Sequence, residues 1–198
     1  MSHFPQRQLP GLGLACRKAR HPLGRVCNPS DLLRGRIGTA RNPAGFHLDT
    51  AKVPGGDEFN LMQRGGDYSI MSGRIELMNS RLSGSEEALA TMTLERLQGV
   101  RAPRLLIGGY GMGFTLRAAL AGIGPQGHVT VAELVPEIIA WARGPMAEVA
   151  AGCLDDPRVT LRMDDVADAM LLAPEPFDAI LLDVDNGPDG LVRTGNDR

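Results

Sequence analysis

Four glycines between an apolar run and a helix-forming run are the residues whose spacing most clearly suggests chemistry. They are Gly108, Gly109, Gly111 and Gly113, within RLLIGGYGMGFTLRAAL (104–120). Glycine tolerates positive φ and leaves room where a Cβ would block a ligand, so such a loop can present backbone N–H groups to a cofactor. We predict a nucleotide-cofactor site at Gly109, Gly111 and Gly113. A tight strand-to-helix turn without a ligand also selects glycine and is the alternative.

Acidic side chains follow each of three later apolar runs. They are Glu133, Asp164, Asp165, Asp183 and Asp185. Open parallel sheets bind ligands at the carboxyl ends of their strands, where these acids would gather. A carboxylate there can accept both hydroxyls of a ribose, because it offers two acceptor oxygens and no donor. For each residue alone, a solvated acid at a strand end is the alternative interpretation.

The elements that must position these residues alternate regularly. We expect strands over 104–108, 128–134, 159–163 and 177–183, separated by helices over 114–121, 136–150 and 165–172. Alternation of this kind predicts an α/β fold with a doubly wound, mostly parallel sheet and right-handed crossovers. Gly144-Pro145 should break or kink the helix over 136–150.

A small β segment is expected ahead of this domain. Short alternating runs over 58–78, interrupted by glycines, predict an antiparallel hairpin or a three-strand meander. A helix should follow, because Ser83 and Glu86 have the spacing of a capping box and Gly99 stands after the last helical residue. We therefore divide the chain into a leader (1–55), a β segment (56–82) and a nucleotide-binding domain (83–198).

Charge is spread unevenly along the chain. Residues 1–55 hold nine Lys or Arg and two acids, whereas residues 56–198 hold twelve and twenty-one. The leader is also rich in Pro and Gly and shows no periodicity, so we expect it to be flexible. An acidic body suits a cationic small molecule and argues against nucleic acid as a partner of the main domain. An ordinary solvated acidic surface is the alternative.

Cysteine usage and hydropathy exclude several classes. Cys16, Cys27 and Cys153 are odd in number and lack C-x-x-C spacing, so neither a disulfide framework nor a zinc site is expected. No run approaches the ~20 apolar residues of a membrane span, so no membrane partner is expected. The leader lacks the pattern of a secretory signal, and we expect a cytoplasmic protein that uses no metal.

The chain resembles the spermidine synthase (polyamine aminopropyltransferase) group of the class I S-adenosylmethionine-dependent methyltransferase fold. The likeness covers about two thirds of the chain and lies in IGGYGMGFTLRAAL, VTVAELVPEIIAWAR, DDPRVTLRMDDVADAM and FDAILLDVDNGPDG. It implies that the three loop glycines hold the aminopropyl or amino-acid end of the donor. It further implies that Glu133 binds the ribose, that Asp165 binds the adenine amino group, with Asp164 beside it, and that Asp183 binds the attacking amine.

The chain departs from that group at three places. After the fourth strand the synthases carry two aspartates three residues apart. In this chain Asp183 holds the first position, Asn186 holds the second, and Asp185 stands one position before it. A tyrosine, a polar residue and a glutamate are expected before the glycine loop, where this chain has Gly84-Ser85-Glu86-Glu87. The sequence also ends soon after the fourth strand, so we expect a fold truncated there relative to the complete type.

Aminopropyl transfer from decarboxylated S-adenosylmethionine to a polyamine is our first prediction of function. A nucleophile attacks the carbon next to a sulfonium, so the enzyme mainly positions an activated donor. An amine with a pKa near ~10 is mostly protonated at neutral pH, and Asp183, with Asp185 as second candidate, would bind the cation and take its proton.

Three other functions stay open. Methyl transfer from S-adenosylmethionine to another acceptor is favoured by the lost second aspartate. A nicotinamide dehydrogenase uses a similar sheet, but Phe114 occupies the position of its third glycine. The last alternative is a truncated, non-catalytic remnant of such an enzyme. In that case the exposed edge of the fourth strand could pair with a second copy of the chain to give a homodimer.

Overall fold

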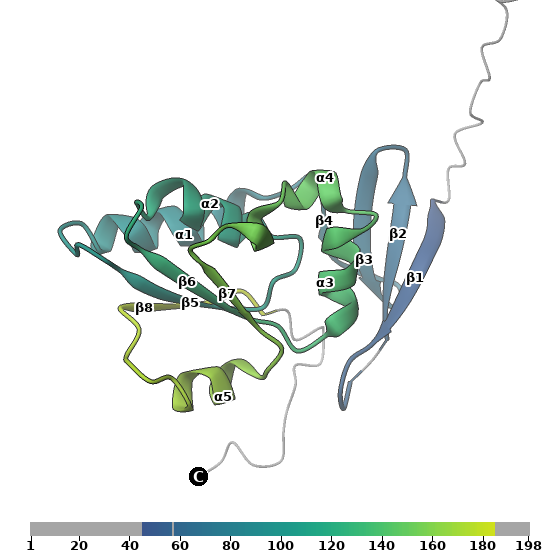
Figure 1. Ribbon diagram of the computed structural model, residues 1–198. Coiled ribbons are helices and arrows are strands. Elements are labelled where there is room, and N and C mark those ends of the chain that lie inside the picture. The colour runs from purple at the N-terminus through teal and green to yellow at the C-terminus, as the bar shows by residue number, and fades with distance from the viewer. Residues whose placement is uncertain (1–44, 57, 185–198) are drawn as a thin grey trace, which may run out of the picture. The chain divides into compact units, whose positions relative to one another are not determined.

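The computed structural model describes residues 45–56 and 58–184 of the 198. The predicted catalytic residue Asp185 and most of the predicted leader lie outside these residues. The described part contains two four-stranded sheets, five α-helices and one short 3-10 helix (Figure 1). In chain order these are Phe46–Lys52 (β1), Glu58–Arg64 (β2), Asp67–Ser72 (β3), Ile75–Asn79 (β4), Gly84–Arg96 (α1), Arg104–Gly108 (β5), Phe114–Gly122 (α2), His128–Ala132 (β6), Pro136–Arg143 (α3), Ala147–Ala150 (α4), Cys153–Asp155 (η2), Val159–Arg162 (β7), Val166–Leu171 (α5) and Ala179–Leu182 (β8).

Strands β1 to β4 form an antiparallel meander with the strand order β1-β2-β3-β4. The predicted β segment is therefore present as β2, β3 and β4, which pair through tight turns at Gly65 and Gly73, both with positive φ. The prediction of a flexible leader over 1–55 is wrong for residues 46–52. They form β1, which pairs with β2 from end to end, apart from one irregularity between His47 and Asp49.

The second sheet is wholly parallel, with the strand order β7-β6-β5-β8. Leu105 at the centre faces Val129 of β6 on one side and Ala179 of β8 on the other. The chain thus builds outward from β5 to β7 and then crosses to the opposite side for β8. The carboxyl ends of β5 and β8 form a topological switch point, which is where open α/β sheets bind ligands.

Helices cover both faces of the parallel sheet, as the alternation predicted. Helices α1 and α2 lie on one face and α5 on the other (Figure 1). The break predicted at Gly144-Pro145 is confirmed, because α3 ends at Arg143 and α4 begins at Ala147. Within the described ranges, every helix is too short or too polar to span a lipid bilayer.

The start of α1 differs from its predicted capping box. Ser83 is the N-cap residue, but no side chain caps the helix. Its hydroxyl instead donates a hydrogen bond of 2.7 Å to Oε1 of Glu87, one position beyond the predicted Glu86. The backbone N–H of Glu87 bonds the carbonyl of Ser83, so the first turn closes without help from the side chain.

The hydrophobic core joins the two sheets. Leu61 and Ile70 of the meander are fully buried in the same cluster as Leu105 and Val131 of the parallel sheet. Trp141 of α3, 2% exposed, belongs to that cluster, and its Nε1–H donates to Oδ2 of Asp49 at 2.7 Å. The meander is therefore held against the end of the parallel sheet where a ligand would bind.

Candidate functional site

The glycine loop follows β5 with three residues in the left-handed region. Gly109, Gly111 and Gly113 have φ values of +84°, +55° and +83°. A Cβ on Gly109 would stand 2.5 Å from the carbonyl oxygen of Asp183, and one on Gly113 would stand 2.6 Å from the hydroxyl of Tyr110. Both backbone conformation and space thus require glycine here, whether or not a ligand binds.

A cavity of about 290 Å³ opens above this loop at the switch point. Six of the predicted site residues line it: Gly109, Gly111, Glu133, Asp164, Asp165 and Asp183. Gly113 does not line it; it precedes α2 as the N-cap residue, and its N–H bonds the carbonyl of Tyr110 at 2.8 Å. The fold therefore gathers the predicted residues, while their roles towards a ligand stay predictions.

Glu133 is buried and already holds the loop in place. It is 6% exposed; its Oε2 accepts from the N–H of Tyr110 and its Oε1 from the N–H of Val135, each at 2.8 Å. Burial raises the pKa of this carboxyl, while the backbone N–H groups oppose that shift. The carboxylate thus ties the glycine loop to the end of β6. If a ribose binds here, its hydroxyls would have to donate to the same carboxylate oxygens that already accept from these amides.

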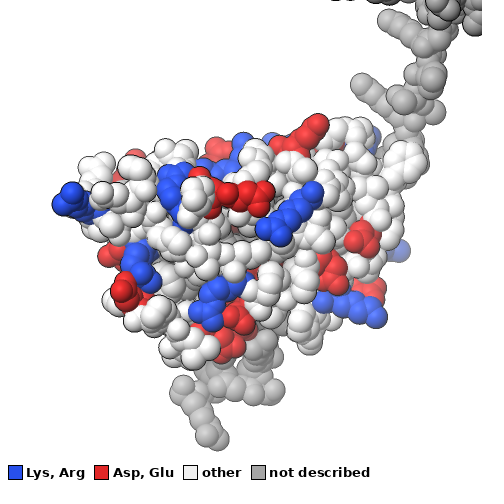
Figure 2. All heavy atoms as spheres, in the orientation of Figure 1, with Lys and Arg blue, Asp and Glu red and all other residues white. Residues whose placement is uncertain are grey.

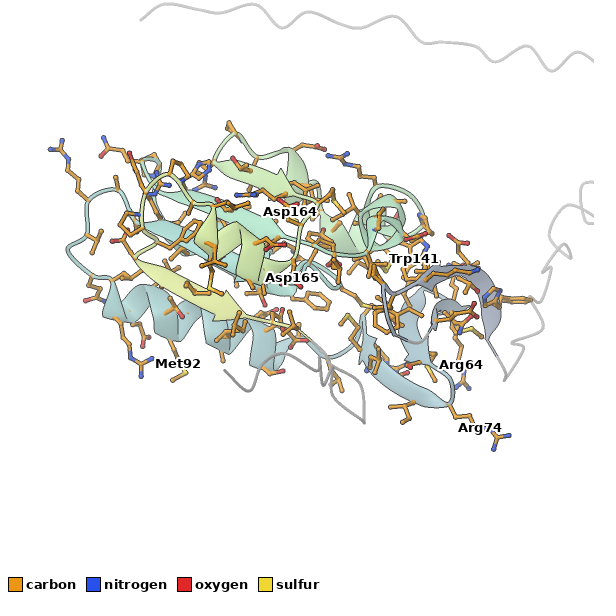
Figure 3. The ribbon with its side chains drawn as sticks, turned by 90° about the horizontal axis from the view of Figure 1, so that it is seen from below. Arg64, Arg74, Met92, Trp141, Asp164 and Asp165 are labelled. Atoms are coloured by element: carbon orange, nitrogen blue, oxygen red, sulfur yellow. The ribbon has the colours of Figure 1, made fainter. Side chains whose placement is uncertain are left out.

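Asp164 and Asp165 stand at the end of β7, beside the start of α5 (Figure 3). Oδ2 of Asp164 accepts two hydrogen bonds from the guanidinium of Arg162, at 3.0 and 2.7 Å. Oδ1 of Asp165 accepts from the N–H of Ala167 at 2.9 Å and so caps α5. Both acids therefore have structural partners in addition to the cavity that they line.

Asp183 follows β8 and faces the start of α2. Its N–H bonds the carbonyl of Gly108 at 2.9 Å, which continues the strand pairing by one residue. Its Oδ2 accepts a hydrogen bond of 2.6 Å from the hydroxyl of Thr115, which is 1% exposed. Sequence reasoning did not single out Thr115, which stands two residues after Gly113.

The meander supplies a second wall of the cavity that sequence reasoning did not assign. Its contribution is wholly apolar and consists of Val53, Phe59, Ile70, Leu77 and Met78. The sulfur of Met78 would stand 3.0 Å from a Cβ on Gly111, so this wall reaches the glycine loop. The only sequence signal for it was the alternation over 58–78, which does not indicate what the strands pack against.

Every charged side chain that lines the cavity, among the described residues, is acidic. Its charged lining residues are Glu133, Asp164, Asp165 and Asp183, and among the described residues no Lys, Arg or His lines it. Arg162 neutralises part of this charge through Asp164. The described residues contain no cluster of three or more His, Cys, Asp or Glu that could hold a metal ion. A cavity of this kind favours a cationic ligand.

No family model matches the chain. Over 97 residues, 48% of this chain, it is 38% identical to the ribosomal RNA small subunit methyltransferase H of Xylella fastidiosa strain M23. That segment spans 29% of the relative's length.

Solved structures of spermidine synthases are among the structural neighbours. The spermidine synthase from Thermotoga maritima matches 73% of this chain and 49% of its own, with a TM-score of 0.59 and 19% identity. A spermidine synthase in complex with the transition-state analogue AdoDATO matches 69% of this chain and 47% of its own chain, with a TM-score of 0.57 and 19% identity. The chain thus spans about half the length of these structures, and over that part it has the class I methyltransferase-like α/β fold that spermidine synthases share.

Proposed function

We propose that this protein transfers an aminopropyl group from decarboxylated S-adenosylmethionine to an amine of the polyamine type. The observation that carries the proposal is the cavity lined by four carboxylates and no basic side chain among the described residues. The decarboxylated donor carries a sulfonium and an ammonium and no carboxylate. S-Adenosylmethionine adds a carboxylate, which would lie in this acidic cavity without a cationic partner and at a cost in desolvation.

The reaction requires positioning and the removal of one proton. The amine nitrogen attacks the carbon next to the sulfonium, a C–N bond forms, the C–S bond breaks and a neutral thioether nucleoside leaves. Before attack, the acceptor must lose the proton that it carries at neutral pH. Asp183, at the cavity wall beside the glycine loop, is the group that we expect to bind the ammonium and accept this proton.

Isothermal titration of the full chain with each donor in turn tests the proposal. We expect the decarboxylated donor to bind more tightly, and mass spectrometry to detect the aminopropyl adduct of 1,4-diaminobutane. Asp183→Asn should abolish the adduct while donor binding persists. Asp168→Asn, which changes an exposed acid of α5, is the matched control and should behave like the wild type. Tighter binding of S-adenosylmethionine would overturn the proposal.

Methyl transfer from S-adenosylmethionine is the second candidate. It is supported by the 97-residue likeness to a ribosomal RNA methyltransferase. An RNA acceptor would need a basic surface for its phosphates. On the face shown in Figure 2, the Lys and Arg side chains are scattered and interspersed with acidic ones rather than joined in one patch. Incorporation of labelled methyl groups into RNA or into amines would distinguish this candidate.

A further inference from the structure

Thr115 is a buried hydroxyl group beside the acidic cavity. It is the second residue of α2 and is 1% exposed, although it does not line the cavity itself. A buried hydroxyl must find a hydrogen-bond partner, because leaving its donor unsatisfied costs the desolvation of that group. The partner that it finds therefore indicates what this residue does.

The hydroxyl has two acceptors within reach and one hydrogen to give. Oδ2 of Asp183 lies at 2.6 Å and the carbonyl oxygen of Glu86 at 3.5 Å. The shorter contact has the length of an O–H···O⁻ bond to an ionised acceptor, whereas the longer one is at the limit of any hydrogen bond. The hydrogen is therefore donated to Asp183.

The backbone of Asp183 is fixed independently of this bond. Its N–H bonds the carbonyl of Gly108, and its own carbonyl lies where a Cβ on Gly109 would be 2.5 Å away. These contacts set where the Cα of Asp183 lies and involve its backbone rather than its carboxylate. The bond from Thr115, across 68 residues of sequence, holds one carboxylate oxygen of Asp183 against the start of α2.

We infer that Thr115 is a positioning residue, whose hydroxyl fixes the rotamer of Asp183 and favours its ionised form for binding the amine. The inference rests on the proposed function only in that the amine is the ligand of Asp183. A donated hydrogen bond stabilises a carboxylate more than a carboxylic acid, so it lowers the pH at which the group becomes protonated. The other carboxylates of the cavity, Glu133, Asp164 and Asp165, are common to all variants compared.

Three variants of the full chain separate orientation from packing. Thr115→Val keeps the shape and removes the hydroxyl, Thr115→Ser keeps the hydroxyl and removes a methyl group, and Thr93→Val is the matched control. The hydroxyl of Thr93 donates within α1 to the carbonyl of Leu89, away from the cavity. If Thr115→Val does not fold, as judged by circular dichroism, Thr115→Ala takes its place.

We expect Thr115→Val to lower kcat/KM for the amine by roughly ten-fold or more, with donor affinity within about two-fold of the wild type. The acid limb of its pH profile should move to higher pH. Thr115→Ser should restore both quantities, and Thr93→Val should change neither. An unchanged profile in Thr115→Val, or no rescue by Ser, would overturn the inference.

A spectroscopic measurement keeps this test independent of turnover. In protein with ¹³C-labelled aspartate, the carboxyl signal of Asp183 is assigned by its loss in Asp183→Asn. We expect that signal to titrate at higher pH in Thr115→Val than in the wild type. If the wild type transfers no aminopropyl group yet the signal shifts, the proposed function fails and the role of Thr115 stands. If the signal does not shift, the role of Thr115 fails whatever the activity.

Discussion

The two faces of the parallel sheet are buried to very different extents. Helices α1 and α2 cover one face (Figure 1). On that face, Leu105, Ile107 and Leu181 are at most 1% exposed and belong to the large core that continues into the meander. On the face of α5, the buried cluster among the described residues consists of Leu106, Ala132 and Ala169. On that face, Ile180 is 46% exposed and Leu182 is 57% exposed.

This difference divides the candidate site into two halves. We name these halves after the proposed function. The donor half, built by the glycine loop and Glu133, lies against the large core and is fixed by packing and backbone hydrogen bonds. The acceptor half is the end of β8, a strand that pairs only with β5 among the described residues. Regions with few buried apolar contacts open at lower free energy. We therefore expect the donor half to keep its structure when the acceptor half is perturbed. Perturbation of the donor half, in contrast, should disrupt both halves.

Substitution of the glycine that links the two halves should have the largest effect. Gly109→Ala forces a left-handed conformation on alanine and places its Cβ 2.5 Å from the backbone oxygen of Asp183. Strain and overpacking together should cost about 2–6 kcal/mol in free energy of unfolding and should abolish donor binding. Chemical denaturation and calorimetric titration measure the two effects.

Gly124→Ala provides the matched control for that substitution. Gly124 also has positive φ, +77°, but nothing stands within 4 Å of its would-be Cβ. It should therefore show the conformational strain alone and keep full donor affinity. An equal loss of stability in both variants would indicate that contact with Asp183 contributes nothing, and the link between the two halves would be wrong.

Local sequence signals were sufficient for the donor half. The glycine spacing and the alternation of apolar runs predicted the loop, the parallel order of elements and the break at Gly144, because turns, strands and helix ends are encoded by neighbouring residues. Strand β1 was missed for the opposite reason. The contact that ties it to the α/β part of the fold is the hydrogen bond between Asp49 and Trp141, which are 92 residues apart.

The chemistry of the site was predictable by residue type but not by contact. The sequence indicated that acids would gather at the carboxyl ends of the strands, and the four described ones line one cavity. It could not indicate that backbone amides already occupy the oxygens of Glu133, or that Thr115 bonds Asp183. Such contacts depend on which elements become neighbours in space, and no local pattern records this.

A pair of leucine truncations tests the contrast between the two faces directly. Leu105→Ala empties a fully buried position in the large core and should cost about 2–5 kcal/mol in free energy of unfolding. Leu182→Ala, in the neighbouring strand, removes a side chain that is 57% exposed and should change stability by about 0.5 kcal/mol or less. Urea denaturation of both variants measures the difference. Similar costs would mean that Leu182 is covered in solution, and the comparison of faces would be wrong.

A smaller effect than that of Leu105→Ala is expected from Glu133→Gln, which separates the structural role of this residue from its ligand-binding role. Both carboxylate oxygens accept from backbone N–H groups, of Tyr110 and of Val135. Glutamine offers a single oxygen, so one N–H would face the NH₂ group and lose its acceptor. We expect a loss of about 1–3 kcal/mol in free energy of unfolding, together with weaker donor binding.

Glu148→Gln, on the exposed side of α4, is the control and should leave both quantities unchanged. The relative size of the two losses in Glu133→Gln, in free energy of unfolding and in donor affinity, shows which role dominates. If Glu133 acts only by tying the loop to β6, saturating donor should raise the stability of wild type and variant alike and leave the difference between them, because the unsatisfied amide persists in the complex. If stability is unchanged and only donor affinity falls, the carboxylate contributes mainly to the ligand, and the donor half is less rigidly built by its own contacts than the burial of Glu133 indicates.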